Sequence, residues 1–193
     1  LRKRRERTMT TALITGISGM VGSHLADYLL ENTDWQIVGL IRWRSPLDNI
    51  SHLVPSANVN GRISFVYGDL RDTLSIEKVV QDSNPDYVFH LAAAVGVFNI
   101  VNNPLASLLT NIRGTENVLE AAFETSTPVF LTSSSEVYGK NISDSLKESD
   151  DRILGSPVTL RWSYSEAKAI DESLAYAYFV EKNLETRIVR FFN

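Results

Sequence analysis

A chain of 193 residues predicts one domain that is large enough for a substantial core. Its hydrophobic share of 44% and charged share of 22% are ordinary for a soluble globular protein. The sequence has no Cys, which excludes disulfides and thiolate metal sites or nucleophiles and fits a cytoplasmic location. The net charge of −4 argues against broad nucleic-acid binding. The longest apolar stretch, residues 87–98, is too short to span a membrane.

Basic residues crowd the first eight positions. Five Arg and Lys residues against Glu6 give this segment a charge of +4, which leaves −8 for the rest of a chain whose net charge is −4. Such a run is typical of a nucleic-acid or membrane arm. It precedes Met9, however, and the residues after Met9 have the pattern of a first strand. We therefore expect residues 1–8 to be a disordered tail and residues 9–193 to form one domain.

Strand-like and helix-like segments alternate along that domain. The expected strands are residues 11–15, 36–41, 62–67, 86–91, 128–132 and 186–192, and the expected helices are residues 20–31, 73–81, 104–124 and 162–181. This alternation predicts an α/β fold with a doubly wound parallel sheet and a ligand crevice at the carboxyl ends of the strands. The helix over 104–124 is expected to carry a wide apolar stripe made of Leu105, Leu108, Leu109, Ile112, Val118 and Leu119. The chain stops after the sixth expected strand, so we expect a fold that is truncated at its C-terminus.

A glycine motif lies between the first expected strand and the first expected helix. In Thr15-Gly-Ile-Ser-Gly-Met-Val-Gly, Gly16 permits a tight turn, Gly19 lets the backbone approach a phosphate, and Gly22 lets the helix pack on the strand. The amides of the helix N-terminus then face the anion. The alternative is a Gly-rich turn without a ligand, but this strand–turn–helix context favours a dinucleotide site.

The end of the second strand indicates which dinucleotide binds. The segment Val-Gly-Leu-Ile-Arg-Trp-Arg, residues 38–44, has no carboxylate to bond an adenosine ribose, and Arg42 suits a 2′-phosphate. NADP is therefore favoured. In the alternative, Arg42 and Arg44 are solvated and the cofactor is NAD.

Two polar segments near the end of the chain carry candidate chemistry. Tyr164 and Lys168 are four residues apart and share a helix face, so the ammonium is expected to lower the pKa of the phenol from about 10 toward the working range. After the fifth strand, the hydroxyls of residues 132–135 can bond a substrate oxygen and Glu136 can serve as a general base. Separately, each segment also fits an ordinary loop or an incidental pair. Together with the glycine motif, they predict a redox enzyme with a nicotinamide cofactor.

No metal site is expected. The three His residues are isolated, and no group of His, Asp and Glu residues has the spacing of metal ligands. His90 ends an apolar strand, so we expect a hydrogen-bonded core residue there.

At this point the chain resembles the extended short-chain dehydrogenase/reductases, specifically their NAD(P)-dependent nucleotide-sugar epimerases and dehydratases. The resemblance covers residues 9–193. It rests on the glycine motif, Gly-Asp-Leu at 68–70, His-Leu-Ala-Ala at 90–93, Ser-Ser-Ser-Glu-Val-Tyr-Gly at 133–139, Tyr-x-x-x-Lys at 164–168 and Arg-Phe-Phe-Asn at 190–193. The residues that would contact the cofactor are Gly16, Ser18, Gly19, Met20, Val21, Gly22, Arg42, Asp69, Leu70, Leu91, Ala92, Ala93, Tyr164 and Lys168. Those that would contact a nucleotide-diphosphate sugar are Ser134, Ser135, Glu136 and Asn193.

The chemistry implied by the resemblance is transient oxidation at sugar C4. Tyr164 would be the base, Ser134 would assist it, and Lys168 would be its electrostatic partner. Glu136 stands where a dehydratase has the residue that removes the C5 proton. A nucleotide-sugar 4,6-dehydratase is therefore favoured, because Glu136, Arg42 and Arg44 all agree with it.

Three alternatives stay open. Two lie within the family: a 4-epimerase, such as a UDP-glucose 4-epimerase, and a UDP-glucuronate decarboxylase, which also carries Ser-Glu at this place. The third is a non-catalytic dinucleotide-binding fragment. The resemblance further implies that the substrate-binding C-terminal region is absent from this chain, and that the protein is a homodimer through the helices over 104–124 and 162–181.

Overall fold

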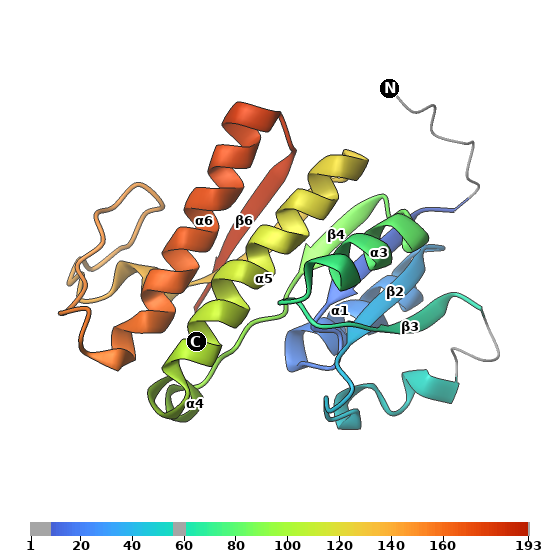
Figure 1. The fold of residues 1–193 in the computed structure, drawn as a ribbon, viewed down its shortest axis with the longest axis horizontal. Coiled ribbons are helices and arrows are strands. Elements are labelled where there is room, and N and C mark those ends of the chain that lie inside the picture. Colours follow the sequence, from blue (N-terminus) through green and yellow to red (C-terminus); the bar gives the residue numbers. More distant parts are fainter. Residues whose placement is uncertain (1–8, 56–60, 193) are drawn as a thin grey trace.

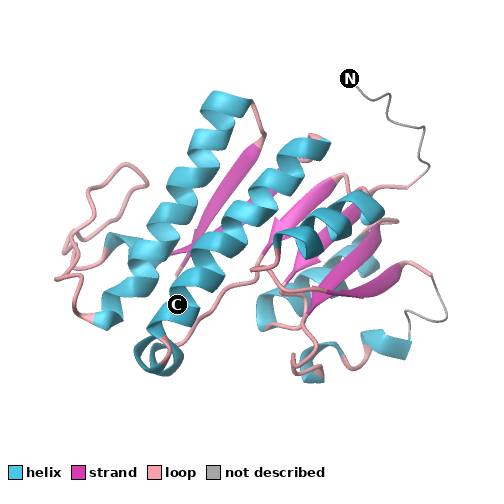
Figure 2. Cartoon of the chain, in the orientation of Figure 1, coloured by secondary structure: helices cyan, strands magenta, loops and turns pink. Residues whose placement is uncertain are grey.

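The computed structural model describes residues 9–55 and 61–192. The predictions for residues 1–8 and for Asn193 therefore fall outside the described residues. Strands and helices alternate along the chain (Figure 1; Figure 2). The strands are β1 (Thr11–Thr15), β2 (Gln36–Ile41), β3 (Ile63–Tyr67), β4 (Tyr87–His90), β5 (Val129–Ser134) and β6 (Thr186–Phe191). The helices are α1 (Met20–Asn32), α3 (Thr73–Ser83), α4 (Val97–Asn102), α5 (Pro104–Thr125) and α6 (Ser163–Lys182), with 3₁₀ turns η1 (Asp48–Ile50), η2 (Ser135–Tyr138) and η3 (Leu160–Trp162).

Within the described residues the strands form one sheet in the order β3-β2-β1-β4-β5-β6. Each neighbouring pair is parallel. The predicted doubly wound α/β fold is therefore confirmed. The strand order reverses between β1 and β4, where Thr15 lies beside Leu40 of β2 on one side and His90 of β4 on the other. A doubly wound sheet opens its ligand crevice at this reversal.

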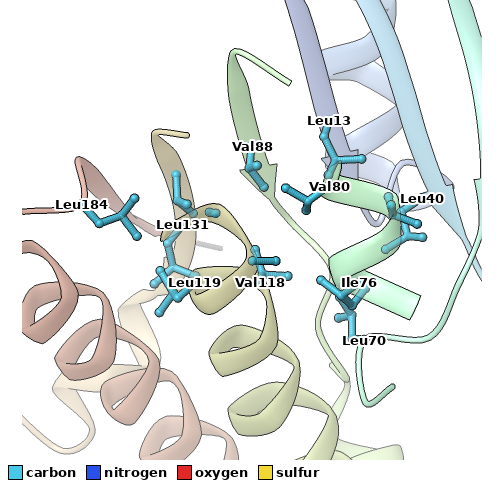
Figure 3. Packing of buried hydrophobic residues seen from close by; sticks show 14 of the residues in the cluster. Leu13, Leu40, Leu70, Ile76, Val80, Val88, Val118, Leu119, Leu131 and Leu184 are labelled. Atoms are coloured by element: carbon cyan, nitrogen blue, oxygen red, sulfur yellow. The ribbon is translucent and has the colours of Figure 1, made fainter. Parts of the chain in front are cut away.

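Apolar side chains alternate between the two faces of the central strand, because successive residues of a strand point to opposite sides. Leu13 belongs to a core cluster with Ile76 of α3 and Val118 of α5 (Figure 3). Its neighbour Ile14 belongs to a second cluster with Leu29 of α1. Helices α3, α5 and α6 accordingly cover one face of the sheet, and α1 covers the other (Figure 1).

Three helices end in left-handed caps, at Asn84 after α3, Ser126 after α5 and Asn183 after α6. Their φ angles are 41°, 53° and 56°. Short polar residues tolerate this conformation and let the last helical carbonyls accept hydrogen bonds. These caps return the chain to β4, β5 and β6, and so bring each strand back into the sheet.

The apolar stripe of α5 is exposed to solvent over its first half. Leu105 is 69% exposed and Leu109 is 37% exposed. The buried residues of α5 are Ser107, Asn111, Gly114, Thr115, Asn117, Val118, Leu119, Ala121 and Ala122. The first half of the helix thus turns a polar face inward, toward the loops that follow the strands. Helix α4 was not predicted, since its six residues are too few to show a helical period.

Candidate active site

A cleft of about 1120 Å³ opens at the carboxyl ends of the strands. Its lining comes from the loops after β1, β2, β3, β4 and β5 and from α6. The predicted site residues that line it are Gly16, Ser18, Gly19, Met20, Val21, Gly22, Arg42, Asp69, Leu70, Leu91, Ala92, Ala93, Ser134, Glu136, Tyr164 and Lys168. Ser135 is not part of this lining. The fold thus gathers residues that are widely separated in the sequence, and the part that each plays stays a prediction.

The glycine turn between β1 and α1 accepts no side chain at two of its three positions. Gly16 has a φ of +75°, and a Cβ there would lie 2.7 Å from the amide nitrogen of Ala92. A Cβ on Gly22 would lie 2.3 Å from the carbonyl oxygen of Gly16. At Gly19 the nearest atom would be that same oxygen, at 3.2 Å.

Gly19 is also the N-cap of α1, and no side chain bonds this end of the helix. The first turn of α1 has no acidic residue that would oppose an anion. Backbone amides at a helix N-terminus bind phosphate. The turn, the uncapped helix and the long cleft therefore fit the pyrophosphate of a dinucleotide, with the adenosine end toward β2.

The loop after β3 lies at that end and is held by α5. Asn117 donates from Nδ2 to the carbonyl of Leu70 at 2.7 Å, and its Oδ1 accepts from the Thr73 hydroxyl at 3.0 Å. Asp69 accepts hydrogen bonds from Arg71. Although burial raises the pKa of Asp69, these hydrogen bonds and the Arg71 charge lower it below its ordinary value. Asp69 therefore presents a fixed negative charge to the cleft.

The loop after β4 is held by a second buried amide of α5. Asn111 accepts from the backbone N–H of Ala94 at 2.6 Å and donates to its carbonyl at 3.1 Å. The Thr15 hydroxyl accepts from the N–H of Ala92 at 3.2 Å. Asn111 and Asn117 thus shape the cleft from behind, and the sequence analysis missed both. Polar residues recur every four positions on one face of α5, at Ser107, Asn111 and Thr115. This repeat is the sequence signal that could have identified the buried polar face.

Tyr164 lies beside Ser134 at the inner end of the cleft. Burial, together with the charges of Glu136 and Asp171, raises the pKa of Tyr164 to about 12, although the hydrogen bond with Ser134 acts to lower it. The sequence-based expectation of a lowered pKa is therefore wrong for the chain without ligands. The phenol keeps its proton at neutral pH until positive charge enters the cleft.

Lys168 explains this difference, because its ammonium is bonded elsewhere. Its Nζ donates to the carbonyl of Thr132 at 2.9 Å and lies 3.3 Å from Oδ2 of Asp171. The side chain is 3% exposed. The carboxylate of Asp171 offsets the positive charge that would otherwise favour the phenolate of Tyr164.

Glu136 faces the cleft in an ion pair with Arg161, which the sequence analysis did not single out. The Arg161 guanidinium lies 2.5 Å from Oε2 of Glu136, and the Ser165 hydroxyl donates to the same oxygen at 3.5 Å. Arg161 in turn packs over the ring of Trp162, 5.4 Å from its centroid. Arg161 of η3 and Ser165 of α6 thus hold Glu136 in place.

His90 is a buried, hydrogen-bonded residue beneath the cleft. Its two ring nitrogens bond the hydroxyls of Thr15 at 2.8 Å and Thr115 at 3.1 Å. Burial and the charge of Lys168 lower the pKa of His90 to about 3, so the ring is neutral. Among the described residues, no group of three or more His, Cys, Asp and Glu side chains is placed to hold a metal ion. Nor does any described helix have the length and apolar character needed to cross a membrane.

The parallel sheet, the glycine turn and the Ser–Tyr–Lys group define a class: the short-chain dehydrogenase/reductases that use a nicotinamide dinucleotide. A family model described as GDP-mannose 4,6 dehydratase matches residues 13–193. The chain therefore belongs to the extended, nucleotide-sugar epimerase and dehydratase family of that class.

Its relatives include decarboxylases. The chain is 33% identical over 186 residues to a UDP-N-acetyl-alpha-D-glucosaminuronate decarboxylase of Bacillus cytotoxicus, a match that covers 94% of this chain and 53% of the relative. It is 31% identical over 182 residues to UDP-glucuronic acid decarboxylase 5 of Arabidopsis thaliana, with 94% and 50% covered. The structure of the Bordetella bronchiseptica enzyme WbmH in complex with NAD⁺ matches with a TM-score of 0.73 at 25% identity, over 96% of this chain and 56% of that one. The chain thus spans about half the length of the relatives it matches.

Proposed function

We propose that this chain forms the dinucleotide-binding and proton-transfer half of an enzyme that decarboxylates a UDP-linked sugar acid. The observation that carries the proposal is the pairing of Glu136 with Arg161 beside the Ser134–Tyr164 group. A 4,6-dehydratase needs a free carboxylate to remove the C5 proton. A 4-keto sugar acid is a β-keto acid, and it loses CO₂ without such a base. The paired Glu136 therefore favours decarboxylation, and the decarboxylases among the relatives favour it as well.

The side chains divide the work in this proposal. Ser134 and Tyr164 bond the C4 hydroxyl of the sugar. The pKa of Tyr164 would fall beside the positive charge of a bound oxidised nicotinamide, and the Tyr164 phenolate would then take the hydroxyl proton. Lys168 supplies positive charge at the inner end of the cleft. Glu136 and Arg161 lie where the neighbouring part of the sugar would sit. A nicotinamide dinucleotide, when bound, supplies the acceptor for the C4 hydride.

The proposed dinucleotide is NAD. The NADP preference that Arg42 predicts has no support among the relatives, and the WbmH structure contains NAD⁺. Arg42 lines the cleft, and its charge helps to lower the pKa of Asp69. Calorimetric titration with NAD and NADP decides the point, with Arg42→Asp as the matched variant. Tighter binding of NADP that is lost in the variant would restore the first expectation.

The test of the reaction uses the full-length protein with NAD and either UDP-glucuronate or UDP-N-acetylglucosaminuronate. The expected result is one CO₂ released for each UDP-pentose formed. Tyr164→Phe is expected to lose this turnover while it keeps its affinity for NAD. A 4-keto-6-deoxy product from a neutral sugar nucleotide would point to a dehydratase, and inversion at C4 to an epimerase. Unchanged NAD binding without turnover on any of these substrates would leave a dinucleotide-binding module.

We further propose that the enzyme is a homodimer through α5 and α6. These adjacent helices expose large apolar side chains to solvent: Leu105, Leu109, Tyr176, Phe179 and Val180. An exposed apolar surface of this kind is typical of an interface. Sedimentation equilibrium of the full-length protein tests the proposal, and Leu105→Glu is expected to give monomers.

A further inference from the structure

A buried carboxylate lies under the floor of the cleft, outside the set of residues that the proposed chemistry uses. Asp171 is three residues after Lys168 on α6, so both side chains lie on one face of the helix. The side chain of Asp171 is 0% exposed, and that of Lys168 is 3% exposed. An unpaired ion at such a depth costs several kcal/mol, so each charge needs the other there.

The hydrogen bonds of Lys168 show what the pairing does. An ammonium has three N–H donors. One donates to the carbonyl of Thr132 at 2.9 Å, and Oδ2 of Asp171 lies 3.3 Å from Nζ. Lys168 also lines the cleft. With two directions fixed by Thr132 and Asp171, the third donor is left for a ligand.

Asp171 itself has little else to hold it. Neither of its carboxylate oxygens accepts a hydrogen bond of regular geometry within the described structure. Burial raises the pKa of Asp171, the charge of Lys168 and the nearby hydroxyl of Thr115 lower it, and the resulting pKa is about 6. Asp171 is therefore ionised at neutral pH, and the positive charge beside it is the main reason.

The other charged groups around the pair have partners of their own or point away. His90 of β4 is neutral above about pH 3. Glu172 of α6 is bonded to Arg190 of β6 at 2.7 and 2.8 Å. Strand β5 contributes no charged residue. On α5, Arg113 and Glu116, which flank Thr115, are exposed, and across the cleft Glu136 pairs with Arg161.

We propose that Asp171 is a positioning residue: it is the counter-charge that keeps Lys168 protonated and holds its ammonium at the floor of the cleft. The pairing stands on the geometry of α6 alone. The hydrogen bond from the third N–H of Lys168 to a bound dinucleotide is a further consequence, and it rests on the proposed function. Asp171 also sets the charge that Tyr164 meets, because its carboxylate contributes to the raised pKa of the phenol.

The first experiment compares the full-length protein with Asp171→Asn, which keeps the shape of the side chain and removes its charge. Isotope-labelled lysine, with the Lys168 signal assigned by Lys168→Met, reports the protonation of Lys168 directly by NMR. Burial without a counter-charge disfavours the protonated form of a lysine side chain. The variant is therefore expected to release the Lys168 proton at least about one pH unit lower than the parent does. An unchanged titration would overturn the proposal.

Glu166→Gln is the matched control. It removes the same charge from the same helix, but Glu166 is 42% exposed and pairs with Arg152. The control is expected to leave the Lys168 titration where it is in the parent. Because this readout needs no ligand, it separates a failure of the pairing from a failure of the proposed function. Between neutral and alkaline pH, the affinity for NAD is expected to fall about tenfold more in Asp171→Asn than in the parent.

A second experiment covers the case in which Asp171→Asn folds but is too unstable for NMR. Thermal unfolding is measured for Lys168→Met, for Asp171→Asn and for the double variant. Residues in contact give non-additive changes in stability. The pairing predicts that the double variant melts at a higher temperature than Asp171→Asn alone, since no buried charge is then left unpaired. A double variant whose losses simply add would overturn the proposal.

Discussion

Adding one methyl group to the glycine turn gives different results at Gly22 and at Gly19. On Gly22 the new Cβ would lie 2.3 Å from the carbonyl oxygen of Gly16 and 2.7 Å from Cα of Ile17. Both are backbone atoms, so α1 or the turn has to move. On Gly19 the nearest atom would be 3.2 Å away, and the φ of −80° suits alanine. Gly22→Ala therefore strains the fold, while Gly19→Ala only places a methyl group in the cleft.

The size of each effect follows from the contacts. Overpacking of this kind costs about 1–3 kcal/mol. For a chain of this length, roughly 2 kcal/mol lowers the melting temperature by about 4–8 °C. Gly19→Ala is expected to stay within about 0.5 kcal/mol of the parent. Its methyl group stands where the phosphates would approach the backbone, so its affinity for a dinucleotide is expected to fall at least about tenfold.

Thermal unfolding and calorimetric titration with NAD, run on the parent and both variants, check the pair. The reasoning fails if Gly22→Ala melts with the parent, because the short distances would then carry no strain. It also fails if Gly19→Ala binds NAD as the parent does, since the turn would then not be where the phosphates lie.

Three further outcomes follow from the contacts of the site. Asn111→Ala leaves buried backbone groups of the loop after β4 unpaired, at about 1–3 kcal/mol each, so faster hydrogen exchange of that loop and weaker NAD binding are expected. Burial and the charge of Glu136 both raise the pKa of Tyr164, which lies at about 12. Glu136→Gln removes that charge, so the phenolate absorbance, read against Tyr164→Phe, should appear at lower pH than in the parent. Although burial raises the pKa of Glu172, Arg190 lowers it below the ordinary 4.5. The ion pair therefore stabilises the fold above about pH 4.5, and this stabilisation is lost as the pH falls through the lowered pKa of Glu172. In urea unfolding, Glu172→Gln should lower the free energy of unfolding by about 1–3 kcal/mol at neutral pH and by little in acid.

The sequence predicted the fold because its local signals agree with one another. The strands at residues 11–15 and 36–41 have the predicted bounds, and the other predicted strand and helix ends lie within about two residues of those observed. Apolar runs and a glycine motif in its strand–turn–helix context each mark an element boundary without any knowledge of the tertiary structure. Agreement among independent local signals is the condition under which such predictions succeed.

The site was predicted less completely, because its polar residues act over long distances in the sequence. A helix that buries Asn111 and Thr115 against distant loops cannot be told from an amphipathic surface helix by its period, so the period of α5 did not identify these two residues. The spacing of Tyr164 and Lys168 predicts that they share a helix face, but it does not predict that the Asp171 carboxylate pairs with Lys168. Arg161 meets Glu136 only after the chain has passed through a loop of more than twenty residues.

The strand order also has a consequence for how the chain folds. Neighbouring parallel strands cannot be joined by a hairpin, so each pairing waits for a crossover to form. Strand β1 finds β2 early, but its second neighbour, β4, follows it by more than seventy residues. The first three strands with α1 can therefore assemble before the rest of the sheet. Non-local pairing of this kind slows folding and exposes the open edge of β1, which makes a transient half-sheet the stage most prone to aggregation.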